Sequence, residues 1–145
     1  MPLFLDVYDV AGSDEFLFYL LAERENYMNI SHKGMPTFDE HYTFVQSKPY
    51  EDWRIIEDGG ILRGSVYLTR NREVGIHILK AYCGMGYGKE AIDFMEKKHG
   101  LPIYANISVN NPGSMAFFDK RGYRRLQETW IKDGGDSGSG DGPCG

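Results

Sequence analysis

The feature that most constrains the fold is a run of three strand patterns between residues 53 and 79. The patterns cover residues 53–57, 61–69 and 73–79, and turn residues bound each of them. Only two short turns, at 58–60 and 70–72, separate one pattern from the next. Strands joined by turns this short lie antiparallel. The run therefore predicts an antiparallel meander at the centre of the fold.

Further patterns precede the meander. Residues 3–7 alternate apolar and polar side chains, which predicts a first strand. Ser13 is a suitable N-cap for a helix that follows it. Thr37, with Glu40 three residues later, matches a capping box and predicts a second helix over 38–46.

After the meander, helix and strand patterns alternate. An amphipathic helix is expected from Gly88 onward, and a strand over 103–109 follows it. Asn111 as N-cap and Pro112 at the first helical position predict a last short helix. A closing strand is expected over 123–131. The whole succession predicts an α/β (α+β) fold, with a mixed, mainly antiparallel sheet of six or so strands and about four helices.

Length and composition fit one domain. Of the 145 residues, 41% are hydrophobic and 26% are charged, which suits a compact core of ordinary size. After Asp133 the composition changes, because Gly, Ser and Asp fill nearly all of residues 134–145. Such a segment cannot bury a core. We expect a folded domain over residues 1–133 and a disordered tail over 134–145.

Charge and hydropathy disfavour several classes of protein. The net charge of −5 gives no strong attraction to nucleic acid or to an anionic membrane. The longest apolar run, 16–22, is about a third of the roughly 20 residues that span a bilayer. The N-terminus lacks the features of a signal peptide, and Cys83 and Cys144 form neither a disulfide framework nor a zinc spacing. We therefore expect a cytoplasmic protein without nucleic-acid or membrane partners.

A glycine-rich stretch links the strand pattern at 73–79 to the helix that follows. Gly84, Gly86 and Gly88 alternate with larger residues. Because glycine has no Cβ, backbone N–H groups can approach an anion closely there, and the helix N-terminus adds favourable charge. The stretch predicts a phosphate-binding loop. The alternative, that the glycines only make a turn, is weaker for three glycines than for one.

Two common phosphate-binding motifs do not fit this loop. The P-loop motif requires glycine where Cys83 stands, and Ser or Thr where Glu90 stands. The dinucleotide-binding motif requires glycine where Lys89 stands. The loop is therefore expected to bind phosphate in another structural context.

Two motifs together resemble one family. Residues 82–87, Tyr-Cys-Gly-Met-Gly-Tyr, preceded by the strand pattern at 73–79, resemble the coenzyme A pyrophosphate loop of the GNAT N-acetyltransferases. Residues 111–123 resemble that family's second motif, N-x-x-[AS]-x-x-L-Y-E-K-x-G-F. The resemblance is strongest to the branch with the ribosomal-protein and aminoglycoside acetyltransferases. The order and separation of the motifs match, and the element succession matches along nearly all of residues 1–133.

The resemblance implies a splayed sheet and a place for acetyl-CoA within it. The fourth and fifth strands would diverge, and the pantetheine arm would pair with the free backbone of the fourth. The pyrophosphate would lie on the amides of the glycine loop. The implied cofactor-binding residues are Ile76, Ile78 and Leu79 in the strand, Gly84, Met85, Gly86, Tyr87 and Gly88 in the loop, and Asn111, Phe117 and Phe118 in the second motif.

The chain departs from the family pattern at three positions. Ala81 stands where many members begin the loop with Gln or Arg. Phe118 replaces a Tyr that serves many members as the general acid, and Asn106 replaces a Glu that some members use as a base. Water, Tyr104 or Tyr123 are the candidates to replace the lost hydroxyl.

Glu73 and His77 are the candidate catalytic residues. An acceptor amine must be neutral to attack, which at pH 7 costs about 4.6 kcal/mol for a lysine and about 1 kcal/mol for an α-amine. The two residues are four apart on one strand and are expected to share a face of the sheet. The structural alternative for His77 is a histidine that is only half-buried in a strand, without a catalytic role. The structural alternative for Glu73 is a solvated residue at the end of a strand. His32, His41 and His99 show no metal spacing and are expected on the surface.

These observations predict an acetyl-CoA-dependent N-acetyltransferase that acts by direct attack of a primary amine, without a metal and without a covalent intermediate. Cys83 is expected beside the phosphates, away from the thioester, which argues against it as a nucleophile. The acceptor is expected to be a small-molecule or peptide amine, and the protein a monomer or homodimer. Two alternatives stay open: a catalytically inactive acyl-CoA-binding regulatory module, and an interaction protein that binds through its acidic tail.

Overall fold

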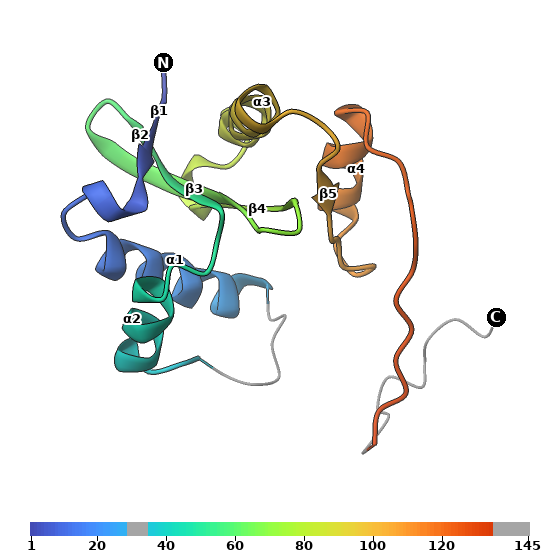
Figure 1. The fold of residues 1–145 in the computed structure, drawn as a ribbon, viewed down its shortest axis with the longest axis horizontal. Helices are drawn as coiled ribbons and strands as arrows, with labels where there is room; N and C mark the ends of the chain where they lie inside the picture. The colour runs from blue at the N-terminus through green and yellow to red at the C-terminus, as the bar shows by residue number, and fades with distance from the viewer. Residues whose placement is uncertain (29–34, 135–145) are drawn as a thin grey trace.

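The computed structural model describes residues 1–28 and 35–134 of the chain. Its sheet has five strands, placed side by side in the order in which they occur in the sequence (Figure 1). The pairs among the first four strands are antiparallel, and the fifth strand is parallel to the fourth. The strands are β1 (Leu3–Asp6), β2 (Asp52–Asp58), β3 (Ile61–Leu68), β4 (Glu73–Ile78) and β5 (Tyr104–Ala105). The predicted meander, β2-β3-β4, is confirmed.

Helices pack on both faces of this sheet. In Figure 1 the helices α1 and α2 lie below the sheet, α3 lies above it, and α4 stands beside β5. The helices are α1 (Ser13–Met28), α2 (Phe38–Gln46), α3 (Tyr87–His99) and α4 (Pro112–Lys120), with single 3₁₀ turns η1 (Val7–Asp9) and η2 (Lys80–Tyr82). No helix in the described ranges is both long enough and apolar enough to cross a membrane. The mixed α/β fold class agrees with the prediction from the sequence.

Two hydrophobic clusters hold the layers together, because alternate residues of each strand point to opposite faces. One cluster joins Ile56 and Val66 of the sheet to Met95 of α3 and to Phe118 of α4. The other joins the opposite face of the sheet to α1 and α2, and its buried members are Val7, Leu17, Leu20, Val45, Trp53, Ile55 and Leu79. The sheet is therefore covered on both sides.

The helix ends follow the capping signals in the sequence. At α2 the Thr37 hydroxyl accepts the Glu40 N–H at 3.1 Å, and the Glu40 carboxylate accepts the Thr37 N–H at 2.8 Å. The predicted capping box is confirmed. At α4 the Asn111 side chain accepts the Ser114 N–H at 3.0 Å, and Pro112 is the first helical residue. Both caps satisfy amides that would otherwise lack an acceptor.

The C-terminal part differs from the prediction. The strand expected over 103–109 is reduced to Tyr104–Ala105, and the strand expected over 123–131 is absent, because these residues form no ladder with any described residue. An extended backbone becomes a strand only when a neighbour supplies hydrogen-bond partners. The side-chain pattern alone does not provide that neighbour. Of the predicted tail over 134–145, all but Gly134 lies outside the described residues.

Candidate functional site

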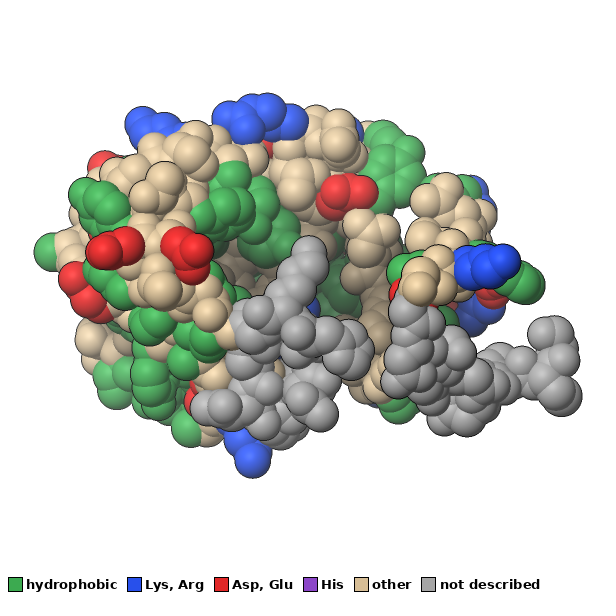
Figure 2. All heavy atoms as spheres, turned by 90° about the horizontal axis from the view of Figure 1, so that it is seen from below, with side chains coloured by type: hydrophobic (Ala, Val, Ile, Leu, Met, Phe, Trp, Pro, Cys, Tyr) green, Lys and Arg blue, Asp and Glu red, His purple; other side chains and the backbone are tan. Residues whose placement is uncertain are grey.

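Strands β4 and β5 meet at one end and separate at the other. They pair only through Glu73 with Tyr104 and Val74 with Ala105. Beyond Val74, β4 continues to Ile78 along β3 without β5 at its other side. Seen from the α1 and α2 side, a furrow divides the larger body of the molecule from its smaller C-terminal part (Figure 2). The splay that the resemblance implied is present in the fold.

The free edge of β4 offers its own backbone polar groups. The Glu73 carbonyl accepts the Thr69 N–H at 2.8 Å, so odd-numbered residues of β4 direct their polar groups toward β3. Successive residues of a strand direct these groups to opposite sides. The N–H and C=O groups of Ile76 and Ile78 therefore face the side from which β5 has diverged. Leu79 differs, since its N–H already donates to the Arg63 carbonyl at 2.9 Å.

The glycine loop leads from β4 into the first turn of α3. Gly84 and Gly86 have φ values of +83° and +90°, and a Cβ at either position would meet nothing within 4 Å. The amides of Gly84, Met85 and Gly86 have no acceptor among the described residues. Gly86 is also the N-cap of α3, so the free first-turn amides of this helix, including that of Tyr87, follow directly. This cluster of exposed donors suits an anion.

Gly88 has a different role from the other two glycines. A Cβ there would lie 3.3 Å from the Phe117 ring, closer than most real Cβ contacts. Gly88 therefore lets α4 approach the first turn of α3. The absence of a side chain at Gly88 allows Phe117 to lie beside the loop.

A stack of three side chains joins the two ends of the loop, formed by Arg63, Tyr82 and Tyr87. The Arg63 guanidinium lies 4.4 Å from the centre of the Tyr82 ring and 5.7 Å from that of Tyr87. The Tyr87 hydroxyl donates to the Asp58 carboxylate at 2.7 Å, which raises the pKa of Tyr87. Sequence reasoning missed Arg63, because it lies 21 residues before Gly84 and belongs to no motif. Only the pairing of β3 with β4 brings it to the loop.

A second missed contact ties α1 to the loop. The Glu23 carboxylate accepts the N–H of Lys80, the first residue of η2, at 2.8 Å. The two residues are 57 apart in the sequence. No local pattern could have paired them.

Helix α4 carries the second motif. The Asn111 oxygen is occupied as the N-cap. Phe118 is buried, with its ring 5.0 Å from the Phe117 ring and 5.1 Å from the Tyr123 ring. The Tyr123 hydroxyl donates to Glu96 of α3 at 2.9 Å, and burial, reinforced by this bond, raises the Tyr123 pKa. The raised pKa makes the Tyr123 hydroxyl a weaker proton donor, which disfavours Tyr123 as the general acid.

Glu73 and His77 lie on the same strand, separated by a covered glycine. Between them stands Gly75, which pairs with Tyr67 of β3, and a Cβ at Gly75 would overlap the Tyr67 ring. Four residues span about 13 Å along a strand, so the two side chains do not act as one pair. The parallel pairing of Glu73 with Tyr104 instead places these two side chains next to each other on one face.

The His77 imidazole is uncharged near neutral pH. Burial, together with the charge of Arg24 on α1, lowers its pKa to about 4, although Glu23 acts in the opposite direction. Such an imidazole can accept a proton but is a weak base. At Cys83, burial and the nearby Glu23 raise the thiol pKa, which disfavours the nucleophilic thiolate.

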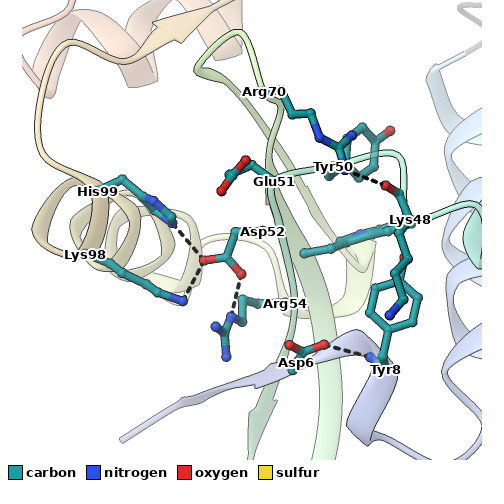
Figure 3. A pocket seen from close by; sticks show the side chains of 11 residues that line it. Asp6, Tyr8, Lys48, Tyr50, Glu51, Asp52, Arg54, Arg70, Lys98 and His99 are labelled. Atoms are coloured by element: carbon teal, nitrogen blue, oxygen red, sulfur yellow. Dashed lines mark hydrogen bonds and ion pairs between the residues drawn. The ribbon is translucent and has the colours of Figure 1, made fainter.

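A separate pocket of about 550 Å³ lies at the opposite end of α3 from the glycine loop (Figure 3). Its main polar feature is Asp52, whose carboxylate contacts Arg54, Lys98 and His99 at 2.7, 2.9 and 2.8 Å. Burial would raise the Asp52 pKa, but these three bonds outweigh it and lower the pKa. With 13 residues, α3 separates this cluster from the loop by about 20 Å. The cluster joins α3 to β2 and is remote from the splay.

The histidines expected on the surface are placed differently. His41 is 6% exposed and its ring contacts the Asp14 carbonyl at 3.2 Å, so the prediction for His41 was wrong. The α1–α2 contact buries a ring that local sequence could not locate. His99 lies against Asp52, and His32 is outside the described residues. The described residues contain no group of His, Cys, Asp and Glu arranged to hold a metal.

Solved structures share this fold at low sequence identity. A transcriptional regulator from Bacillus halodurans aligns with a TM-score of 0.68 and 14% identity, over 92% of this chain and 99% of the other. An acetyltransferase from Thermus thermophilus aligns with a TM-score of 0.66 and 19% identity, over 93% and 91%. A ribosomal-protein-alanine N-acetyltransferase from Brucella melitensis aligns with a TM-score of 0.67 and 15% identity, over 88% and 86%.

No curated protein matches the chain. The model of the acetyltransferase (GNAT) family matches residues 16–123, a range that contains the splayed strands, the glycine loop and the start of the segment after α4. Since this match covers most of the sequence, the chain belongs to the GNAT family of acetyltransferases.

Proposed function

We propose that the protein transfers the acetyl group of acetyl-CoA to a primary amine. The observation that carries this proposal is the free edge of β4, which leads directly into a loop of unpaired amides at the start of α3. An extended amide-bearing chain with a diphosphate at one end has the matching chemistry. Its amides would bond to Ile76 and Ile78, and its diphosphate to the amides of Gly84, Met85 and Gly86.

The proposed reaction is a direct attack of the neutral amine on the thioester carbonyl carbon. A C–N bond forms, the C–S bond breaks, and sulfur leaves as thiolate, while the surplus proton of the nitrogen passes to a base. The thiolate needs little assistance, because a thiol pKa is about 8.5. Holding amine and thioester together supplies much of the rate, on the order of 7 to 11 kcal/mol. No enzyme nucleophile is needed, in keeping with the raised pKa of Cys83.

We assign the base role to Glu73 in preference to His77. Glu73 lies where β4 and β5 meet, beside Tyr104, and thus at the closed end of the splay. Tyr104 is 42% exposed and supplies a hydroxyl there. His77 lies on the other side of the Tyr67 ring, where the charges of Arg24 and Glu23 of α1 act on it, and there it would line the acceptor side as a neutral group.

Catalytic variants can test this assignment. Glu73→Gln is expected to lower kcat about 100-fold with little change in KM for acetyl-CoA. His77→Gln is expected to lower it less, and the wild-type pH profile should show no ionisation near pH 6.5, because the His77 pKa is about 4. A loss in His77→Gln as large as in Glu73→Gln would move the base role to the histidine.

The acceptor is proposed to be a small-molecule or peptide amine. The net charge of −5 is compatible with a cationic amine, although it selects none in particular. The structures that share the fold include a ribosomal-protein-alanine N-acetyltransferase, which makes peptide N-termini the first acceptors to assay. Aminoglycosides and polyamines complete the panel.

A regulatory module that binds acyl-CoA without turnover is the second candidate. Phe118 favours it, because this residue carries no hydroxyl and is buried between Phe117 and Tyr123. The two functions separate in one assay. Purified protein is mixed with acetyl-CoA and the amine panel, free thiol is followed, and binding is measured by calorimetry; binding without thiol release from any amine would establish the module.

The loop assignment has a test of its own. Gly86→Val is expected to raise the KM for acetyl-CoA at least tenfold, because a branched side chain blocks the amides and opposes the φ of +90°. Gly100→Val is the matched control. Gly100 follows the last turn of α3, has a φ of +74° and has equally open surroundings, but it lies at the far end of the helix. Equal KM values in the two variants would remove the pyrophosphate from this loop.

A further inference from the structure

The turn between β3 and β4 carries an arginine in an unusual backbone conformation. Arg72 has a φ of +66°, in the left-handed region that residues with a Cβ rarely adopt. Thr69 closes the turn around it. The Thr69 carbonyl accepts the Arg72 N–H at 2.9 Å, and the Thr69 hydroxyl accepts the Glu73 N–H at 3.0 Å. A backbone strain that neighbouring residues enforce points to a task for the side chain.

The Arg72 side chain crosses to the connection between α3 and β5 and bonds to three of its carbonyl oxygens. Its Nε donates to the Pro102 carbonyl at 2.7 Å, and its Nη2 donates to those of His99 and Gly100 at 2.9 and 2.6 Å. The positive charge suits this place, because His99 and Gly100 form the C-terminal end of α3, where the helix dipole is negative. Arg72 therefore fixes the end of α3 and the start of the chain toward β5.

The backbone of the same residue holds β5 itself. The Arg72 carbonyl accepts the Tyr104 N–H at 2.8 Å. Strand β5 is only two residues long, and Tyr104 pairs in it with Glu73, the residue after Arg72. Leu101, in the connection, is 70% exposed and adds little packing there. The side chain and the backbone of one residue in the β3–β4 turn thus set where β5 lies against β4 (Figure 1).

We propose that Arg72 is a positioning residue for acetyl transfer, which holds β5 against the catalytic end of β4. Its side chain fixes the connection, its carbonyl fixes Tyr104, and Tyr104 and Glu73 are thereby kept next to each other at the closed end of the splay. The inference rests on the proposed function, in which Glu73 is the base. The bonds of Arg72 go to residue 69 and to residues 99–104, outside the glycine loop, so the KM for acetyl-CoA should not depend on them.

A pair of matched variants tests the proposal. Arg72→Met removes the donors of the side chain and is expected to lower kcat about tenfold or more, with the KM for acetyl-CoA changed less than roughly twofold. Arg70→Met is the control. Arg70 lies in the same turn and also donates to two carbonyls, those of Lys48 and Pro49, but these belong to the connection between α2 and β2. An unchanged kcat in Arg72→Met, or an equal loss in both variants, would overturn the proposal.

A conservative variant separates geometry from charge. Arg72→Lys keeps the positive charge, but a lysine ammonium lacks the planar fork that reaches carbonyls on different residues. Its kcat is therefore expected to lie between those of Arg72→Met and wild type, and clearly below wild type. Full recovery in Arg72→Lys would mean that a positive charge beside Glu73 is sufficient, and would refute positioning by the guanidinium.

Amide hydrogen exchange, followed by NMR, supplies a readout that needs no reaction. The Tyr104 N–H should exchange roughly tenfold faster in Arg72→Met than in wild type, and at the wild-type rate in Arg70→Met. Amides of β2 and β3 should stay protected in both variants, which shows that the sheet is folded. If they do not in Arg72→Met, Arg72→Lys allows the same comparison in a milder variant.

The two readouts distinguish failure of this inference from failure of the proposed function. Unchanged exchange at Tyr104 would refute the hold of Arg72 on β5, even in an enzyme that transfers acetyl groups. A wild type that transfers no acetyl group to any amine would refute the proposed function, and with it the catalytic role of Arg72, even where exchange at Tyr104 responds as expected.

Discussion

The β2-β3-β4 meander and the region where β4 leaves β5 and enters the loop both depend on glycines, but for opposite reasons. In the meander Gly64 is required because space is absent: a Cβ there would overlap the His77 carbonyl oxygen. In the loop beyond β4, Gly84 and Gly86 have open space around them and are required for their positive φ and exposed amides. The meander is closed by pairing along its whole length, whereas the junction is held by two residue pairs. The junction and the loop beyond it have fewer backbone hydrogen bonds within the described chain than the meander has. Their backbone groups are therefore the ones available to bind a ligand.

The largest effect on stability is expected at the β4–β5 junction, which is held by side-chain packing more than by backbone hydrogen bonds between strands. Phe118→Ala removes a buried ring that joins α4 to the main cluster, and should destabilise the fold by about 3 to 5 kcal/mol. In native-state hydrogen exchange, protection should fall first in β5 and α4 and last in β2 and β3. Uniform loss of protection would mean that the junction is as cooperative as the meander.

A substitution that creates a backbone clash tests how tightly the β2-β3-β4 meander is packed. Gly64→Ala should cost about 3 kcal/mol or more in chemical unfolding, because the neighbouring atoms belong to the β4 main chain and cannot turn aside. Gly113→Ala is the control. Gly113 lies inside α4, and its Cβ would meet only the Asn111 side chain at an ordinary 3.7 Å, so this variant should be neutral or slightly stabilising. Equal stabilities of the two variants would show that the meander can relax.

Acid should destabilise the β2-β3-β4 meander through His77. The folded-state pKa of about 4 lies below the ordinary 6.5, so the unfolded chain takes up a proton that the folded chain refuses. Stability is thus complete above about pH 6.5 and declines toward pH 4, by up to about 3 kcal/mol for this group. The buried His41, whose pKa is also lowered, adds to the decline. Urea unfolding at pH 7 and pH 4.5 should show a smaller difference in His77→Gln than in wild type, and an unchanged difference would contradict the burial of the imidazole.

The smallest effect is expected at the cap of α2, which lies in neither region. Thr37→Ala removes the acceptor of the Glu40 N–H and should cost about 1 kcal/mol. The KM for acetyl-CoA should stay unchanged, because α2 packs against α1 and belongs to the hydrophobic cluster on the face of the sheet opposite to α3. Thr37→Ser, which keeps the hydroxyl, should restore most of the loss. A change in KM would reveal coupling between α2 and the cofactor side that the contacts do not show.

Features set by neighbours in the chain could be predicted from the sequence. The capping box at Thr37 and the cap at Asn111 formed as expected, because each needs only three or four consecutive residues. The meander also formed, since its short turns leave one way to pair. The order of the glycine loop and helix α3 follows from the same local signals.

Features set by distant partners could not be predicted. The expected strand at 123–131 has the right side chains, but no described residue pairs with it. The burial of His41 depends on where α1 lies, and the stacking of Arg63 on the two tyrosines that flank the loop depends on the register of β3 with β4. In the site itself, sequence spacing put Glu73 and His77 on one face, but it could not place the Tyr67 ring between them.

The fit of Tyr67 over Gly75 limits how this enzyme can be redesigned or can diverge. The ring stacks on Tyr50 at a centroid distance of 3.9 Å, so it has little freedom to swing away. Any side chain introduced at position 75 must be accompanied by a smaller one at position 67, and the two positions should vary together among descendants of this sequence. An engineer who wishes to widen the acceptor side next to His77 should therefore begin with a paired library at 67 and 75 instead of single exchanges.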